Sequence, residues 1–193
     1  MQPAEHPLVV ERDVGAIGRA ASDPEYRSDP ERTVTMLATL LGELHDEHPA
    51  PGSLPVVTAV DVAEGLHRSH ERGELVAERL DPAYRHMSLD RLVDVLVEGA
   101  ASLGDRPVDV LTHGAPTLEH LRVDDGRALG FTAWQLAALG DPARDLAPAV
   151  RSLVATYGPG VVPAFFARYP HPTPPVTVID WYALADALGA CRP

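Results

Sequence analysis

Residues 111–147 read LTHGAPTLEHLRVDDGRALGFTAWQLAALGDPARDLA and combine alternating apolar residues with turn residues. In the middle of this stretch, the sequence DDG at 124–126 is typical of a tight turn between antiparallel strands. We therefore predict three short strands, over 108–112, 121–123 and 129–132. Because an Asp-Pro pair commonly opens a helix, GDP at 140–142 predicts the start of a helix.

Helical periodicity dominates on both sides of this stretch. Asp29 and Ser88 each precede a stripe of apolar residues at helical spacing, so they predict the N-caps of two helices. Three more helices are predicted, over 58–80, 160–169 and 176–190, and PLVVE at 7–11 predicts a short strand. The pattern indicates a mostly helical α+β protein with a small β-hairpin.

The composition is that of an ordinary globular protein, with 193 residues of which 45% are hydrophobic and 23% charged. The sequence contains no apolar run of membrane-spanning length and no secretory signal pattern, and its one cysteine, Cys191, cannot form an internal disulfide. We therefore expect a cytoplasmic protein without membrane contact.

Charge and residue usage exclude two further classes. The formal net charge is −12, and the 16 basic residues are arginines spread along the chain, so nucleic acid is not an expected partner. Because lysine is absent, the lysine that holds phosphates in P-loop and kinase sites is excluded.

The stretch at 111–147 resembles the catalytic half of the aminoglycoside phosphotransferase family. That family shows a strand followed by His-Gly-Asp and, four residues later, by Asn. A hairpin, Asp-Trp and Gly-Asp-Pro-Ala-x-Asp-Leu-Ala follow. Here His113 and Gly114 stand at the His-Gly pair, Trp134 stands at the Trp, and GDPARDLA at 140–147 reproduces the last block without gaps.

The resemblance extends more weakly towards the N-terminus. LATLLGELH at 37–45 resembles the first helix of the family's large lobe, and PLVVERDVG at 7–15 resembles its hinge strand. The resemblance implies a single helical, kinase-like large lobe over 29–193 and a hinge-like strand segment over 1–28. It also implies that the N-lobe is missing, since about 30 residues are too few for a domain of that size.

Three positions depart from the family pattern. Ala115 stands where the family has its catalytic Asp, His120 where it has a metal-binding Asn, and Ala133 where it has a second metal-binding Asp. In kinase-like chemistry a carboxylate accepts the hydroxyl proton, while Asn and Asp hold Mg²⁺ against the phosphates. Because Mg²⁺ prefers hard oxygen ligands, these substitutions imply no phosphate transfer from ATP, no metal and no other cofactor.

The remaining residues divide into structural and chemical candidates. An Asp in the family's last block bonds back to the catalytic loop, which implies a structural role for Asp141 or Asp145; Asp141 equally fits an N-cap. His113 and His120 are candidate catalytic acid–base residues, because histidine titrates near neutral pH. Hydrogen bonding to the loop backbone is the alternative for His113.

Arg122, Trp134 and Arg144 are candidate substrate-binding residues, with the arginines available for a carboxylate or a peptide carbonyl. The alternatives are plain surface positions for the arginines and a core position for the tryptophan. His67 and His70 lie one turn apart on a predicted helix, but two ligands do not make a metal site.

Short, degenerate phosphotransferase-like proteins are encountered in bacterial clusters that make ribosomally synthesised, modified peptides. This likeness of type suggests a peptide substrate and a thioether ring closure of the lanthionine or aminovinyl-cysteine kind. A cysteine thiol or enethiol would add to a dehydroamino acid. A histidine would take the thiol proton, and an arginine would stabilise the enolate.

Two other functions stay open on the sequence. The chain fits a non-catalytic module that binds a peptide or a companion enzyme, and its acidic charge also fits sequestration of a cationic drug, although that charge is diffuse. Without an N-lobe, apolar surface would be exposed. We therefore expect a homodimer or a heteromeric partner enzyme to cover that surface.

Overall fold

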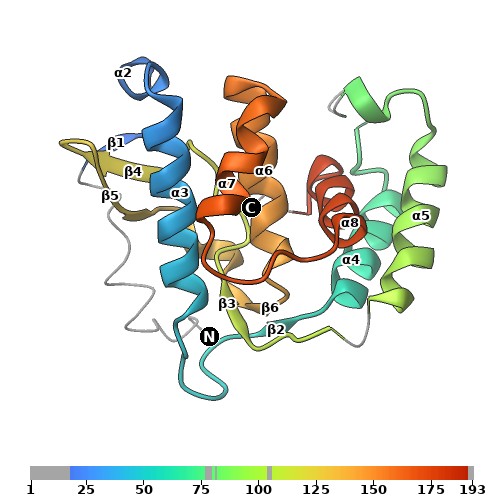
Figure 1. The fold of residues 1–193 in the computed structure, drawn as a ribbon. Coiled ribbons are helices and arrows are strands. Elements are labelled where there is room, and N and C mark those ends of the chain that lie inside the picture. The colour runs from blue at the N-terminus through green and yellow to red at the C-terminus, as the bar shows by residue number, and fades with distance from the viewer. Residues whose placement is uncertain (1–17, 77–79, 81, 104–105, 191–193) are drawn as a thin grey trace.

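The computed structural model describes residues 18–76, 80, 82–103 and 106–190. In Figure 1, helix α3 and a β-hairpin lie at one end of the molecule, α4, α5 and α8 lie at the other, and α6 and α7 lie between them. The strand predicted over 7–11 and Cys191 lie outside the described residues. The arrangement confirms the prediction of a mostly helical α+β protein with a small hairpin.

Three helices in the first half of the chain begin at capping side chains. Asp29 and Ser88 each accept a hydrogen bond from a backbone N–H of the following turn, as predicted. Thr58 adds a reciprocal capping box with Asp61, which the sequence analysis did not anticipate. The three helices are α3 (Pro30–His45), α4 (Ala59–Glu71) and α5 (Leu89–Ser102).

The helix predicted over 58–80 is too long, because α4 ends at Glu71. Gly73 adopts a φ of +68°, and its N–H donates to the carbonyl of His70 at 2.8 Å. The N–H of Glu74 donates to the carbonyl of Ser69 at 2.9 Å. A left-handed glycine with these two bonds is a common helix C-cap, so Gly73 ends the helix although the apolar spacing continues.

In the described residues, the strands form two three-stranded sheets. The first sheet is antiparallel, has the order β1-β4-β5 and contains the predicted hairpin. Its strands are β1 (Arg19–Ala20), β4 (Leu121–Asp124) and β5 (Arg127–Phe131). The second sheet has the order β2-β6-β3, with β2 and β6 parallel. Its strands are β2 (Val56–Val57), β6 (Ala138–Gly140) and β3 (Val110–Thr112).

The C-terminal half is helical, as predicted. Its helices are α6 (Ala143–Tyr157), α7 (Val162–Arg168) and α8 (Val176–Ala187), and a short helix α2 (Pro24–Arg27) precedes α3. Three 3₁₀ turns cover Pro82–Tyr84, Trp134–Leu136 and Pro159–Val161. Within the described part of the chain, none of these helices is long and apolar enough to cross a membrane.

Two clusters of buried side chains form the core. The first joins α3, α6, α7 and the hairpin, and contains Leu37, Leu41, Phe131, Leu153 and Phe165. The second joins α4, α5 and α8 and contains Leu66, Leu96, Trp181 and Leu184. Because α6 contributes Leu153 to the first cluster and Ala147 to the second, it connects the two. The start of α6 therefore has a fixed position relative to both sheets.

Candidate functional site

The loop that follows β3 is fixed by a buried carboxylate from the first turn of α6. Asp145 accepts hydrogen bonds from the backbone N–H groups of His113 and Gly114, at 2.7 and 2.6 Å. Burial alone would raise the pKa of Asp145, but the hydrogen bond from His45 and nearby positive charge hold it below its ordinary value. The carboxylate is therefore ionised and restrains the loop backbone.

A second layer of side chains holds Asp145. The Nε2 atom of His45, at the end of α3, lies 3.3 Å from the Asp145 carboxylate. The hydroxyl of Tyr169 lies 2.6 Å from the Nδ1 atom of the same imidazole. With Nε2 as the donor to Asp145, Nδ1 accepts from the tyrosine hydroxyl. His45 ends the stretch LATLLGELH that resembles the first large-lobe helix of the family, and no pattern in the sequence pointed to Tyr169.

His113 lies inside this loop with both ring nitrogens engaged. Its Nε2–H donates to the carbonyl of Thr132 at 2.7 Å, and its Nδ1 accepts from the N–H of Ala115 at 3.2 Å. The side chain is fully buried, and burial lowers its pKa from 6.5 to about 4. At neutral pH His113 is therefore an uncharged imidazole that links the loop to the segment after β5.

His120 differs from His113 in having a free nitrogen. Its Nδ1–H donates to the carbonyl of Ala115 at 2.8 Å, which leaves Nε2 with the lone pair. Among the described residues, no hydrogen-bond partner is found for this Nε2 atom. The side chain is half-buried, and its ring centre lies 6.0 Å from that of His113. Of the two predicted acid–base residues, only His120 has a ring nitrogen without a hydrogen-bond partner among the described residues.

Arg122 lies on the face of β4 that points away from the core. Leu121 and Val123 are fully buried in the core, so the alternation of a strand directs Arg122, which lies between them, to the other face. The Nε atom of Arg122 is buried and has no hydrogen-bond partner. Its neighbours in the sheet are Ala20 on β1 and Gly130 on β5, both small residues. The guanidinium therefore keeps one donor without a partner among the described residues.

Trp134 and Arg144, the other two predicted substrate-binding residues, have structural contacts. The Trp134 Nε1–H donates to the carbonyl of Phe131 at 2.9 Å, and the indole packs edge-on against His113 with ring centres 4.7 Å apart. Arg144 is only 6% exposed, and it donates to the Thr112 hydroxyl and to the carbonyl of Leu136, both at 2.7 Å. Arg144 ties β3 to the 3₁₀ turn.

Asp141, the second aspartate of the block at 140–147, is also buried. It accepts from the N–H of Ala143, the first residue of α6, at 2.8 Å, and it forms an ion pair with Arg106. The predicted N-cap role of Asp141 is wrong, because Pro142 occupies the N-cap position of α6. The two structural candidates therefore have different contacts. Asp145 binds the loop backbone, and Asp141 binds its own helix.

Two of the positions at which the resemblance implies a base and a metal ligand carry only a methyl side chain. Ala115 is 4% exposed, and Ala133 adopts a left-handed conformation with φ +64° and ψ +55°. The described residues contain no group of three or more His, Cys, Asp or Glu that could hold a metal ion. His67 and His70 contact different carboxylates, Glu71 at 3.5 Å and Asp90 at 2.7 Å.

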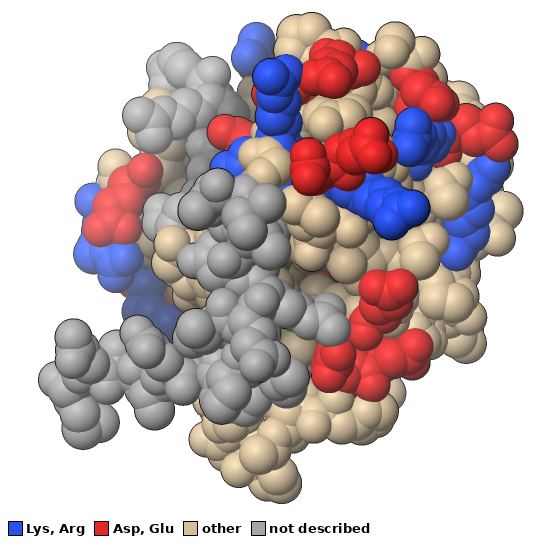
Figure 2. Space-filling view, turned by 90° about the vertical axis from the view of Figure 1, so that its left-hand side faces the viewer, with Lys and Arg blue, Asp and Glu red and all other residues tan. Residues whose placement is uncertain are grey.

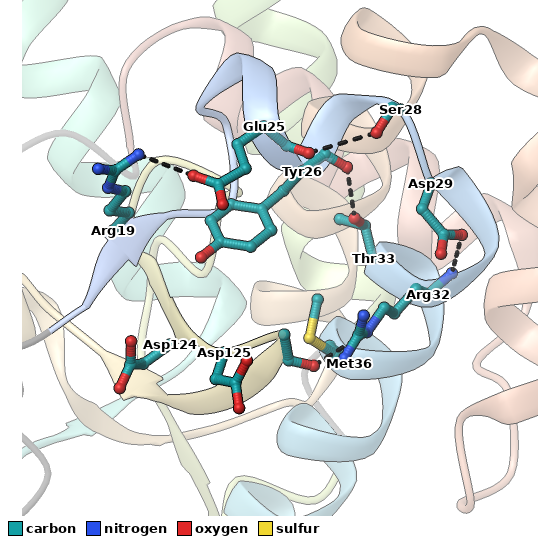
Figure 3. Close-up of a pocket in the computed structure, with 11 residues that line it drawn as sticks. Arg19, Glu25, Tyr26, Ser28, Asp29, Arg32, Thr33, Met36, Asp124 and Asp125 are labelled. Atoms are coloured by element: carbon teal, nitrogen blue, oxygen red, sulfur yellow. Dashed lines mark hydrogen bonds and ion pairs between the residues drawn. The ribbon is translucent and has the colours of Figure 1, made fainter.

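A large hollow, of about 770 Å³, lies away from this loop. Figure 3 shows that its walls come from α2, the start of α3 and the turn of the hairpin. Arg19 pairs with Glu25 at 2.7 Å inside it, and Arg32 donates to the carbonyl of Gly126 at 3.0 Å. On the described part of the adjoining face, acidic and basic side chains lie together in the upper part of Figure 2, and a separate acidic group lies lower down. The lining of the hollow carries more carboxylates than arginines, since Glu25, Asp29, Asp124 and Asp125 stand against Arg19 and Arg32, so its charge is negative and does not suit an anionic ligand.

Comparison with known proteins identifies what this architecture is similar to. Residues 6–183 match the family described as phosphotransferase enzyme family. The aminoglycoside phosphotransferase APH(3'')-Id from Streptomyces rimosus superposes with a TM-score of 0.75 at 19% identity, over 89% of this chain and 66% of that chain. An aminoglycoside-3'-phosphotransferase of type VIII superposes with a TM-score of 0.74 at 22% identity and the same coverage.

The coverage and the sequence identity decide how much these two similarities establish. The chain spans about two thirds of the length of these two solved structures. At identities near 20%, the structural likeness establishes the fold and not the substrate. No curated protein sequence matches the chain.

Proposed function

The chain belongs to the phosphotransferase enzyme family, and from that premise we propose that it uses the family's loop for chemistry other than phosphate transfer from ATP. The contrast within the loop carries this proposal. Asp145 still binds the loop backbone, whereas Ala115 and Ala133 stand where the resemblance implies carboxylates. A methyl group can neither accept a proton nor bind Mg²⁺.

The reaction that we favour is thioether ring closure in a peptide. The Nε2 atom of His120 takes the proton of a cysteine thiol or enethiol, and the sulfur attacks the β-carbon of a dehydroamino acid. A C–S bond forms while the Cα–Cβ π bond opens, and the guanidinium of Arg122 stabilises the developing enolate. Protonated His120 then gives its proton to Cα. The product is an isomer of the substrate, so the atoms balance without a cofactor.

The choice of His120 and Arg122 rests on unused hydrogen-bonding atoms. His120 has a free Nε2, and Arg122, two positions further along the chain, has a buried Nε without a partner among the described residues. His113 and Arg144 have their polar atoms committed to the backbone and to Thr112. We therefore assign His113, Trp134 and Arg144 to positioning the loop in this proposal.

Thiol loss measures this activity. Purified protein is incubated with a dehydrated, cysteine-containing precursor peptide, and free thiol is then counted by alkylation and mass spectrometry. We expect faster thiol loss than without protein and a decrease of about 100-fold or more for His120→Ala, the usual size of a general acid–base contribution. His48→Ala, which changes an exposed histidine, is the matched control. Equal thiol loss with and without protein would exclude ring closure.

A non-catalytic module that binds a peptide or a companion enzyme is the second candidate. An apolar groove of about 440 Å³ between α4 and α5 favours it, because Val60 and Val97 are 41% and 45% exposed there. Binding of the precursor without thiol loss would support this module. A homodimer, a heteromeric partner and a cytoplasmic location are proposals that go with either candidate.

A further inference from the structure

A second hollow, of about 440 Å³, adjoins the loop on the side of α4. The second half of α4 forms one wall, the residues that follow α8 form another, and Arg144 lies at the end nearest the loop. Arg144 donates to Thr112, and its terminal nitrogen is 2.8 Å from the position that a Cβ on Gly114 would take. A ligand in this hollow would therefore lie beside the loop.

The charges that line this hollow are mainly positive. Arg68, Arg72 and Arg144 face a single carboxylate, that of Asp61, among its described lining residues. Asp61 is already bound by the N–H and hydroxyl of Thr58, at 2.8 and 2.6 Å. A local excess of arginine is unexpected in a chain with a net charge of −12. The hollow therefore attracts an anionic group in an otherwise acidic protein.

The two arginines of α4 keep donors for a ligand. Arg68 contacts Glu64 through one terminal nitrogen at 3.3 Å. Arg72 contacts Glu74 through Nε and one terminal nitrogen at 2.6 and 2.8 Å, and the same terminal nitrogen donates to the Ser69 hydroxyl at 3.2 Å. Because a guanidinium carries five N–H donors, Arg68 keeps most of its donors and Arg72 keeps those of its other terminal nitrogen. Neither glutamate lines the hollow. Because the planar guanidinium matches a carboxylate in two parallel hydrogen bonds, a carboxylate is the anion that fits best.

Gly65, which has no side chain, lines the hollow and leaves part of its volume free. A Cβ built on Gly65 would meet no atom within 4 Å, although Gly65 lies inside α4 at a helical position. A larger side chain here therefore extends into the hollow without displacing other groups. Glycine in a helix interior lowers the stability of the helix, so a substitution of Gly65 also removes this destabilising residue.

We propose that this hollow binds the carboxylate of an acidic peptide segment. This inference rests on the proposed function, because it takes the peptide to be the substrate whose thiol and dehydroamino acid react at His120. Arg68 and Arg72 bind the carboxylate, and Arg144 defines the end of the hollow beside the loop. A peptide of opposite charge is repelled by the same residues.

Peptide binding tests the site without any reaction. A fluorescein-labelled peptide rich in Asp and Glu and a matched Lys peptide are titrated with the full chain, and anisotropy is measured at low salt. We expect the acidic peptide to bind at least about tenfold more tightly than the Lys peptide. Gly65→Leu and the double variant Arg68→Gln, Arg72→Gln should each weaken the acidic peptide about tenfold, and the melting temperature of Gly65→Leu should not fall.

Arg91→Gln is the matched control, because Arg91 is an exposed arginine on α5 that pairs with Glu98 outside the hollow. Equal binding of the two peptides, or unchanged binding by Gly65→Leu, would overturn the site. Binding of inorganic phosphate without binding of the acidic peptide would overturn the ligand class. If thiol loss is absent while the acidic peptide still binds in a Gly65-dependent way, the ring-closure proposal fails and the site stands.

Discussion

The burial of His113 makes the stability of the folded protein depend on pH. Its pKa falls from 6.5 to about 4 on burial, so the folded protein keeps it neutral where the unfolded chain takes up a proton. The stabilisation that this difference represents is complete above pH 6.5 and is lost as the pH falls from 6.5 towards 4. The shift corresponds to about 3 kcal/mol of unfolding free energy.

Urea unfolding at pH 7 and at pH 4 checks this expectation. The free energy of unfolding should fall by about 2–3 kcal/mol more for the natural chain than for His113→Gln, because glutamine takes up no proton. His48→Gln removes an exposed histidine and should keep the natural pH dependence. Identical pH dependence in the natural chain and in His113→Gln would mean that His113 is not held neutral.

The residues of the candidate site show which of its features could be predicted from the sequence. The loop and its substituted positions were identified because they lie together in one continuous stretch, 111–147. Tyr169 was not identified, because it reaches His45 across 124 positions of the chain. Chemical role was also hard to predict. Whether a histidine keeps a free nitrogen depends on carbonyls such as those of Thr132 and Ala115, which no sequence pattern reveals.

Among the elements, helix starts and the three strands around the hairpin were predicted better than helix ends, and the strands β1, β2 and β6 were not predicted. Asp29 and Ser88 cap helices through contacts within one turn, so local sequence suffices. The pairing of β2 with β6 joins Val57 to Gly140, and a strand of two residues has no periodicity to detect. The small second sheet therefore depends on tertiary packing that the sequence does not display.

Two glycines of the α4 region should respond oppositely to the same substitution. Gly65→Ala should raise the free energy of unfolding by about 0.5–1 kcal/mol, since its Cβ meets open space in a helix. Gly73→Ala should lower it by about 1 kcal/mol, because φ at this position is +68°. Urea unfolding of both variants measures the contrast. Stabilisation by Gly73→Ala would show that α4 does not end in a left-handed cap.

The whole molecule is built around two buried clusters that α6 connects. Gly99 of α5 packs against the indole of Trp181 on α8, whose Nε1–H donates to the carbonyl of Leu96 at 3.1 Å. An ion pair between Arg151 and Asp186 adds a polar link between α6 and α8. Because α6 contributes to both clusters, separation of the two would expose apolar side chains of that helix on one side. The two clusters should therefore unfold together.

The two tryptophans of the chain make this cooperativity measurable, because Trp134 lies in the first cluster and Trp181 in the second. In Trp181→Phe the fluorescence reports the first cluster, and in Trp134→Phe it reports the second. Each variant is unfolded in urea and followed by both fluorescence and far-ultraviolet circular dichroism. Within each variant the two curves should coincide, as expected for a two-state domain. A fluorescence transition that precedes the loss of helix in either variant would show that its cluster unfolds separately. In that case α6 does not couple the side of the molecule that holds the loop after β3 to α4, α5 and α8.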